Sequence, residues 1–373
     1  MFVILLWVIF GLLSFGILGI NFALLRRAAI KPWRLKIDKS YLPKVTILVP
    51  TYNESDVIRF KLENLRKLDY PKELLQLIIV DSNSTDNTFD VAADFAQRYQ
   101  ELNIKVLKET KREGKSAALN SALSHANGEL IIVSDADCFY PNDILRKSVP
   151  YMSDPKVGAI SGPKLLLNCE HSEIVKNEER YLKSMNYAKL GESKLGFTPL
   201  FEGGFSAYRR DDLASFDPYK TGSDDCGTVI KLAESATGAL LIPEAAFFTT
   251  FPLKWTERFG IKIRRGNQLI RVFSKYLSLF LRGRLNYGKR VILTNVFTYL
   301  FSPFFFVSFL VLTVVAFLTY PYLALLMLLF LIPNMRALSV EVFQSYFVLF
   351  FSVLAVIFKK NFLIWKQPAD RHL

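Results

Sequence analysis

Residues 128–137 constrain the fold most, because an apolar run rich in β-branched side chains leads directly into two carboxylates. Residues 130–133 predict a buried strand, and the sequence SDAD follows at its end, with Asp135 and Asp137 two positions apart. In an open α/β sheet, ligands bind at the carboxyl ends of the strands. The stretch therefore predicts a site for a hard divalent cation, Mg²⁺ or Mn²⁺, that carries a diphosphate.

Strands and helices alternate through the first half of the chain. Residues 44–50 predict a further buried strand, residues 77–80 predict the next strand, and residues 104–107 continue the pattern. Residues 54–68 carry apolar side chains at helical spacing. This alternation predicts an α/β fold with a mostly parallel sheet and helices on both faces. A single carboxylate such as Asp81 or Asp86 could simply cap a helix, but polar residues after several strands together favour a ligand crevice.

The N-terminal segment is too apolar for a soluble domain, and 51% of the whole chain is hydrophobic. Residues 1–25 contain no charged side chain, and six lysines and arginines follow by residue 39. That length spans a bilayer, and basic residues stay on the cytoplasmic side. We expect a signal anchor with its N-terminus outside, followed by a basic linker at residues 26–43.

The C-terminal segment is equally apolar, since Arg336 and Glu341 are the only charges in residues 291–358. Breaks near residues 319–322 and 333–336 favour two crossings joined by an extracytoplasmic or re-entrant segment, with three shorter crossings as the alternative. Residues 359–373 would then be a cytoplasmic tail.

The net charge of +13 falls outside these apolar segments, and phosphates are its natural partners. Because the basic residues cluster beside the apolar segments, we expect anionic headgroups or a phosphorylated substrate, and not nucleic acid. Cys138, Cys169 and Cys226 have no CxxC spacing, which argues against a zinc site or a disulfide framework.

Four motifs in order closely resemble the family 2 glycosyltransferases with the GT-A fold: VPTYNE at 49–54, VDSNSTDNT at 80–88, REGKSAALN at 112–120 and SDAD at 134–137. The resemblance covers about residues 45–272. With its flanking apolar segments, the chain looks like the membrane-embedded branch that includes hyaluronan, chitin and cellulose synthases, and like polyprenyl-phosphate glycosyltransferases. The resemblance implies a UDP- or GDP-sugar donor, a divalent metal, and inversion at the anomeric carbon.

The same resemblance assigns roles to single residues. Asp137 would hold the metal, Asp135 would face the ribose or the donor sugar, and Lys115 would contact the base or a phosphate. The remaining contacts that it implies around base and ribose are Pro50, Thr51, Tyr52, Glu54 and Asp81.

The sequence FEGGFSAYRR at 201–210 resembles the family's glycine-containing strand, with Gly203 and Gly204 on the acceptor side. Asp224 and Asp225 resemble its Glu-Asp pair, with Asp225 at the position of the general base and Asp224 in support. Inverting transfer needs a carboxylate that accepts the proton of the acceptor hydroxyl. The alternative is that Ser223 or Asp224 caps a helix over residues 228–236.

Residues 254–290 carry eleven lysines and arginines against one acid, interleaved with aromatic and aliphatic side chains. This pattern predicts basic amphipathic interfacial helices whose apolar face enters the bilayer. Gln268 and Arg271 resemble part of the Gln-x-x-Arg-Trp motif of processive synthases, although Val272 occupies the Trp position. The resemblance implies that Gln268 and Arg271, with Arg264 and Arg265 nearby, bind the donor.

The sequence thus predicts a multi-pass protein of the plasma membrane with a cytoplasmic GT-A domain at residues 44–253. Its expected activity is transfer of a sugar from a nucleotide-diphosphate sugar to a lipid-linked or polyprenyl-phosphate acceptor. The alternatives are a processive polysaccharide synthase and a non-catalytic membrane scaffold with a nucleotide-sugar-binding domain.

Overall fold

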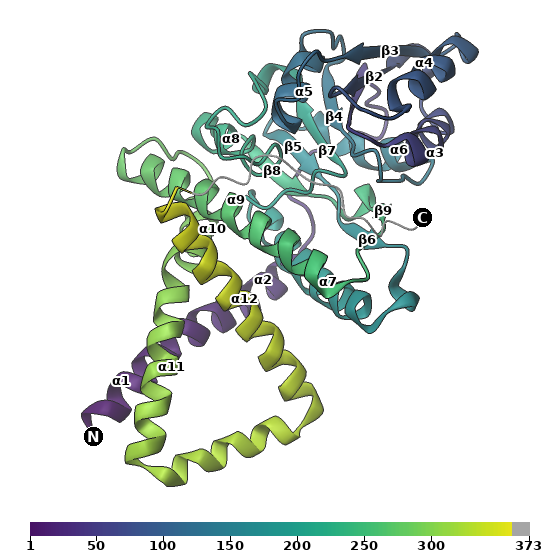
Figure 1. Cartoon of the computed structure of the whole chain (residues 1–373). Coiled ribbons are helices and arrows are strands. Elements are labelled where there is room, and N and C mark those ends of the chain that lie inside the picture. The colour runs from purple at the N-terminus through teal and green to yellow at the C-terminus, as the bar shows by residue number, and fades with distance from the viewer. Residues whose placement is uncertain (360–373) are drawn as a thin grey trace.

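The computed structural model describes residues 1–359. Figure 1 shows an α/β domain beside a group of long apolar helices. Of the predicted cytoplasmic tail at residues 359–373, everything after Lys359 lies outside the described residues.

A seven-stranded sheet forms the centre of the α/β domain, in the order β3-β2-β1-β4-β7-β5-β8. Its strands are β1 (Val45–Thr51), β2 (Leu75–Asp81), β3 (Asn103–Lys108), β4 (Leu130–Val133), β5 (Val157–Ser161), β7 (Ser206–Arg209) and β8 (Gly238–Leu241). Only β7 runs antiparallel to its neighbours β4 and β5. The predicted, mostly parallel sheet is therefore confirmed. A separate parallel pair is formed by β6 (Lys164–Leu166) and β9 (Phe247–Thr249).

Helices cover both faces of the sheet because successive residues of a strand point to opposite sides. Ile47 of β1 packs in one core with Ile58 and Leu62 of helix α3, whereas its neighbour Leu48 packs in a second core with Leu119 of α5. The helices of this domain are α3 (Ser55–Arg66), α4 (Thr88–Arg98), α5 (Lys115–Leu123), α6 (Ile144–Ser148) and α8 (Ile230–Ser235). Short 3₁₀ helices join these elements at η2 (Lys72–Leu74), η3 (Val149–Ser153), η4 (Cys169–His171), η5 (Arg210–Asp212) and η6 (Pro243–Ala245).

The loops after β1 and β2 are fixed to each other, which shapes the edge of the sheet where the site lies. The carboxylate of Asp86 accepts bonds from the N–H of Ser55 (3.1 Å) and of Thr88 (3.0 Å), at the starts of two helices. Asp86 is therefore the helix-capping carboxylate that its sequence position allowed.

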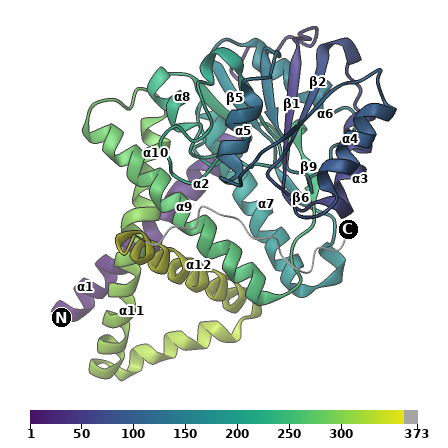
Figure 2. The same cartoon turned by 45° about the horizontal axis from the view of Figure 1, so that its top comes forward.

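Two long helices, α7 (Glu173–Lys194) and α9 (Trp255–Leu281), lie between the α/β domain and the apolar helices (Figure 2). Helix α7 packs along the N-terminal helix so closely that a Cβ on Gly191 would lie 2.2 Å from the carbonyl oxygen of Leu25. In α9, the side chains of Val272, Phe273 and Tyr276 are fully buried in the second core of the α/β domain. The expectation that the apolar face of this helix enters the bilayer is wrong for these residues, because protein covers them.

Within residues 1–359, three helical regions are long and apolar enough to cross a membrane: Phe2–Ala29, Lys289–Thr319 and Ser339–Ile357. They contain α1 (Phe2–Gly11), η1 (Leu12–Gly16) and α2 (Ile17–Ala29), then α10 (Lys289–Val296), η7 (Phe297–Phe301) and α11 (Ser302–Thr319), and most of α12 (Pro333–Ile357). The 3₁₀ helix η8 (Pro321–Leu331) joins α11 to α12. These regions coincide with the segments expected to cross, and the sidedness of each end stays a prediction.

Candidate active site

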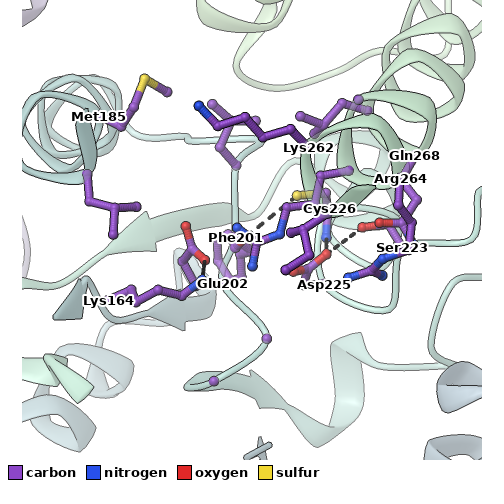
Figure 3. A pocket seen from close by; sticks show the side chains of 18 of the residues that line it. Lys164, Met185, Phe201, Glu202, Ser223, Asp225, Cys226, Lys262, Arg264 and Gln268 are labelled. Carbon is purple, nitrogen blue, oxygen red and sulfur yellow. Dashed lines mark hydrogen bonds and ion pairs between the residues drawn. The ribbon is translucent and has the colours of Figure 1, made fainter. Parts of the chain in front are cut away.

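One cavity of about 2070 Å³ connects the strand ends of the α/β domain with the apolar helices. Single ligand sites hold roughly 300–1,000 Å³, so this volume can accommodate two substrates. Figure 3 shows part of its wall. The predicted site residues that line it are Pro50, Thr51, Tyr52, Glu54, Lys115, Asp135, Asp137, Gly203, Gly204, Asp224, Asp225, Arg264, Arg265 and Gln268.

At the end of β1, the guanidinium of Arg112 stacks over the ring of Tyr52, 3.5 Å from its centroid. Asn53 and Asn83 follow their strands with φ of 53° and 57°, and Asn53 Oδ1 accepts the N–H of Thr85 at 2.8 Å. These contacts hold the two strand-end loops together. Arg112 was not predicted as a site residue, although it is the first residue of the third motif.

Asp81 at the end of β2 is fully buried and does not line the cavity, whereas its neighbour Ser82 does. Asp81 Oδ2 accepts the N–H of Ser84 at 3.1 Å, and Oδ1 has no hydrogen-bond partner among the described residues. A buried carboxylate oxygen without a donor is costly.

Lys115, the first residue of α5, joins two parts of the site. Its Nζ lies 2.6 Å from Asp135 Oδ1 and 2.8 Å from Asp224 Oδ2. Burial raises the pKa of Asp224 to about 6, against the opposing effect of Lys115. Burial alone would lower the pKa of Lys115, but Asp135 and Asp224 raise it well above its usual value, so this side chain is an ammonium.

The oxygen atoms of Asp135 and Asp137 and the sulfur of Cys138 lie within 4.8 Å of one another, close enough to ligate one ion. Burial raises the pKa of the Cys138 thiol well above its usual value, and a neutral thiol is a poor ligand for Mg²⁺ or Mn²⁺. Asp135 is paired with Lys115, and Asp137 is the second carboxylate of this group.

Lys61 of α3 supports the loop of Asp135, Asp137 and Cys138 from behind and was missed by sequence reasoning. Its side chain is fully buried, its Nζ donates to the carbonyl of Cys138, and it lies 4.1 Å from the centroid of the Tyr140 ring. Burial lowers its pKa to about 8. A signal was present, since Lys61 shares the apolar face of the helix with Ile58 and Leu65.

The two glycines of the FEGG sequence are required for different reasons. A Cβ on Gly203 would lie 2.8 Å from Lys115 Nζ, so glycine there allows the close approach of the charged cluster. A Cβ on Gly204 would lie 2.1 Å from the ring of Phe247, which is a packing constraint beneath the site.

Asp225 faces the cavity from the loop before α8 (Figure 3). Its Oδ1 accepts bonds from the hydroxyl of Ser223 and from the N–H of Cys226 at 2.6 Å. Helix α8 begins at Ile230 without a capping side chain, so the alternative that Ser223 or Asp224 caps this helix is wrong. Gln268 Nε2 donates to the carbonyl of Gly222 and thereby attaches α9 to this loop.

The three arginines predicted on α9 are not brought together. Arg264 and Arg265 line the cavity, whereas Arg271 does not, and its Nε donates to Asn267 Oδ1 at 3.1 Å within the same helix. Burial lowers the pKa of Arg264 to about 10.

A second charged group lines the cavity on the α7 side and was not predicted. Glu202 lies 2.5 Å from Lys189 Nζ and 3.4 Å from Lys164 Nζ. Burial by itself would raise the pKa of Glu202, but the positive charges of Lys189 and Lys164 hold this pKa well below its usual range. Glu178 of α7 accepts two bonds from Arg258 of α9, at 3.1 and 2.9 Å.

Comparison with known proteins identifies related chains. The family described as "Glycosyl transferase family 2" matches residues 46–216. "Probable glycosyltransferase YdaM" of Bacillus subtilis (strain 168) is 30% identical over 290 residues, which cover 74% of this chain and 66% of the relative. A "Beta-monoglucosyldiacylglycerol synthase" of Nostoc sp. is 32% identical over 193 residues, 51% of this chain and 41% of the relative. The chain thus spans two thirds or less of the length of these relatives.

One solved structure is similar over nearly the whole chain. It is "Mannosyltransferase PcManGT from Pyrobaculum calidifontis in complex with GDP-Man and Mn2+", with a TM-score of 0.82 and 28% identity. The similarity covers 96% of this chain and 100% of that chain. The arrangement of the sheet relative to the apolar helices is therefore shared with a protein that binds GDP-Man and Mn²⁺.

Proposed function

The chain belongs to glycosyl transferase family 2, and we propose that it transfers a sugar from a nucleoside-diphosphate sugar to a lipid-linked acceptor at a membrane. The observation that supports this most is the continuity of the cavity. One end is lined by Tyr52 and Arg112 at the strand ends, and the other by Phe15 and Phe22 of the N-terminal helical region and Leu349 of α12. A nucleotide fits the first environment, and a hydrocarbon chain fits the second.

At the donor end, the stacked pair of Tyr52 and Arg112 presents a flat surface for a nucleobase. The unpartnered Oδ1 of Asp81 would accept an N–H from the base after a small shift of the Ser82 loop. The bound ligand of the Pyrobaculum structure supports a nucleoside-diphosphate sugar, and both UDP- and GDP-sugars remain candidates here.

Asp137 would hold a divalent cation, Mg²⁺ or Mn²⁺, with Asp135 beside it. When bound, the cation neutralises charge that develops on the diphosphate leaving group. Arg264 lies among the carboxylates of the donor end and would add a second positive charge there. Lys115 would hold Asp135 and Asp224 in place between donor and acceptor.

Asp225 would accept the proton of the acceptor hydroxyl during in-line attack on the anomeric carbon. Ser223 and the N–H of Cys226 both engage Oδ1 and so fix the carboxylate with Oδ2 as the proton acceptor. Gly203 leaves room beside Lys115 for the sugar that is transferred.

Two alternative functions fit less well. A processive polysaccharide synthase would use the aromatic side chain of the Gln-x-x-Arg-Trp motif to stack its polymer, but Val272 is fully buried in the protein core at that position. A non-catalytic scaffold has no need for Asp224 and Asp225 at the cavity, where a carboxylate must lose hydration.

The test is transfer by the full chain, purified in detergent and supplied with radiolabelled GDP-mannose or UDP-sugars and a membrane lipid extract. We expect release of nucleoside diphosphate that requires Mn²⁺ or Mg²⁺, and label that enters the organic phase as a single-sugar product. Asp137→Ala should abolish both, whereas Asp94→Ala, which removes a surface carboxylate, should not. Label in long water-soluble polymer would favour the processive synthase, and no turnover with any donor would favour the scaffold.

A further inference from the structure

The adjacent arginines of α9 face different parts of the cavity. The charged neighbours of Arg264 include Asp224, Asp225 and Asp135, at the donor end. Those of Arg265 are led by Glu202 and Glu178, on the α7 side, and also include Asp225. Successive side chains on a helix point about 100° apart, which explains why the leading neighbours differ. The sequence predicted both arginines as donor contacts, but the leading charged neighbours of Arg265 are the carboxylates of the α7 side.

That environment is a basic chamber, which we define as the part of the cavity wall formed by five cations around Glu178 and Glu202. Lys262 Nζ lies 3.6 Å from Glu178 and 5.3 Å from the centroid of the Tyr181 ring, so its ammonium has one carboxylate and one aromatic ring as neighbours. The cations of the chamber are Lys164, Lys189, Arg258, Lys262 and Arg265, all of which line the cavity.

The chamber carries more positive than negative charge. Glu341 of α12 adds a third carboxylate, 3.6 Å from Arg258, so five cations face three acids and the excess is +2, or +1 when Asp225 beside Arg265 is counted with the acids. Lys164, Lys189 and Arg258 are 8%, 5% and 5% exposed. Buried charge of one sign is expensive unless a counterion compensates it. One phosphate or diphosphate group supplies a counterion of the right sign for this excess.

The chamber is accessible to a ligand and lies on the path of the acceptor. Arg265 is exposed within the cavity, and Figure 3 shows Lys262 and Lys164 on opposite sides of the open space, with Asp225 nearby. Met185 of α7 and Phe22 of the N-terminal helical region are among the apolar residues that line the same cavity. An anion held here would therefore sit between the reacting hydroxyl and a hydrocarbon chain.

We propose that the basic chamber binds the phosphate or diphosphate of an acceptor lipid, with Arg265 and Lys262 as its direct contacts. The acceptor is then a phosphate-bearing lipid and not a neutral one. Arg265 offers the planar donor pair that suits phosphate oxygens, and Lys262 adds a point charge. Lys189 and Lys164 hold Glu202 and keep this carboxylate from pairing fully with Arg265. This inference rests on the proposed function and specifies the substrate class of that same site.

The test compares binding of farnesyl phosphate and farnesol to the full chain in detergent, with Mn²⁺ and nucleoside diphosphate present. A charge-assisted contact to phosphate predicts that farnesyl phosphate binds about tenfold tighter or more. The double variant Arg265→Gln with Lys262→Gln should lose this preference. Arg264→Gln, at the adjacent residue, is the matched control. It should weaken donor binding but keep the preference for farnesyl phosphate over farnesol.

Equal affinity of the two lipids, or a preference that survives in the double variant, would overturn the proposal. Displacement of farnesyl phosphate by inorganic phosphate at similar concentration would show a site for a free anion and would also overturn it. Metal-dependent hydrolysis of the donor, measured on the same preparation, reports the proposed function independently. If the protein hydrolyses the donor but binds the two lipids equally, only this inference is wrong. If it hydrolyses none of the donors, the proposed function is wrong.

Discussion

The ammonium of Lys115 lies 2.8 Å from the carboxylate of Asp224 and so connects the start of α5 to the loop that carries Asp225. The same ammonium lies 2.6 Å from Asp135 after β4. One side chain therefore fixes the distance between the proposed donor and acceptor sides. Its two carboxylate partners come from motifs that are far apart in the sequence.

Replacing Lys115 should disturb chemistry more than folding. In Lys115→Met, Asp135 and Asp224 repel each other without a counterion, and we expect turnover to fall by roughly 10² or more. The side chains of this group are 17–33% exposed, so the loss of stability should stay at about 1–2 kcal/mol. Turnover and melting temperature are compared with Lys111→Met, whose ion pair lies at the surface. Equal effects of the two substitutions would contradict the bridging role.

Gly203 tests the need for space beside the charged cluster. Gly203→Ala places a methyl group 2.8 Å from Lys115 Nζ, and we expect a large loss of transfer with a small change in melting temperature. Gly260→Ala is the matched control, because nothing lies within 4 Å of the added Cβ. In an exposed helical position that control should be neutral or slightly stabilising. Normal transfer by Gly203→Ala would mean that the sugar passes elsewhere.

Glu192 of α7 should make the fold less stable as pH rises. Burial raises its pKa from 4.5 to about 7, although Thr198 and Asn295 donate to it at 2.6 Å. Between these two pH values the folded protein holds a proton that the unfolded chain has released, so stability falls with increasing pH. The full pKa shift of Glu192 corresponds to a change of at most about 3 kcal/mol in the free energy of unfolding.

Glu192→Gln cannot ionise and should lack this decline. Melting temperatures of the wild type and of Glu192→Gln, measured from pH 5 to pH 8.5, should diverge in favour of the variant at high pH. Other groups titrate in both proteins, so the difference isolates Glu192. Parallel curves would show that Glu192 is not held neutral by its surroundings.

The fold was predictable to the extent that it follows from local patterns. Apolar runs of four to seven residues identified β1, β2 and β4, because buried parallel strands have no polar face. The edge strand β3 has no buried residue, and its place followed from the alternation of strands and helices. The strand-end motifs likewise located most of the cavity wall. Lys61 and Arg112 were missed because their roles depend on contacts across long stretches of sequence, such as the 77 residues between Lys61 and Cys138.

The long basic helix was harder to interpret for a physical reason. A stripe of apolar residues flanked by lysine and arginine fits a bilayer surface and a protein core equally well. In α9 the stripe around Phe273 packs on the sheet domain, and the basic face divides between two parts of the cavity. The spacing of apolar residues predicts the helix itself. Only tertiary contacts determine whether each face of the helix packs on protein, lines the cavity or contacts lipid.

The crossings of the apolar helices can be tested with single cysteines. If the sheet domain is cytoplasmic and α11 and α12 both cross, the turn at Tyr320 lies outside. In a Cys169→Ser background, with Cys138 and Cys226 buried, Tyr320→Cys should react with an impermeant maleimide on intact cells, and Glu101→Cys should not. The reverse labelling pattern would place the sheet domain outside.

The central claim is that Asp225 accepts the proton of the acceptor and does not hold the donor. Asparagine keeps the shape of the side chain but cannot accept that proton, and general-base catalysis supplies about 10² to 10⁴ of the rate. Asp224, the supporting carboxylate, provides the comparison. Asp224→Asn should reduce the transfer rate less than Asp225→Asn does.

The most direct measurement is the transfer rate of Asp225→Asn at saturating donor, together with its affinity for nucleoside diphosphate and Mn²⁺. We predict a loss of transfer by about 10² to 10⁴ with donor and metal affinity near wild type. Near-normal turnover, or a loss confined to donor affinity, would contradict this assignment and move the base to another residue.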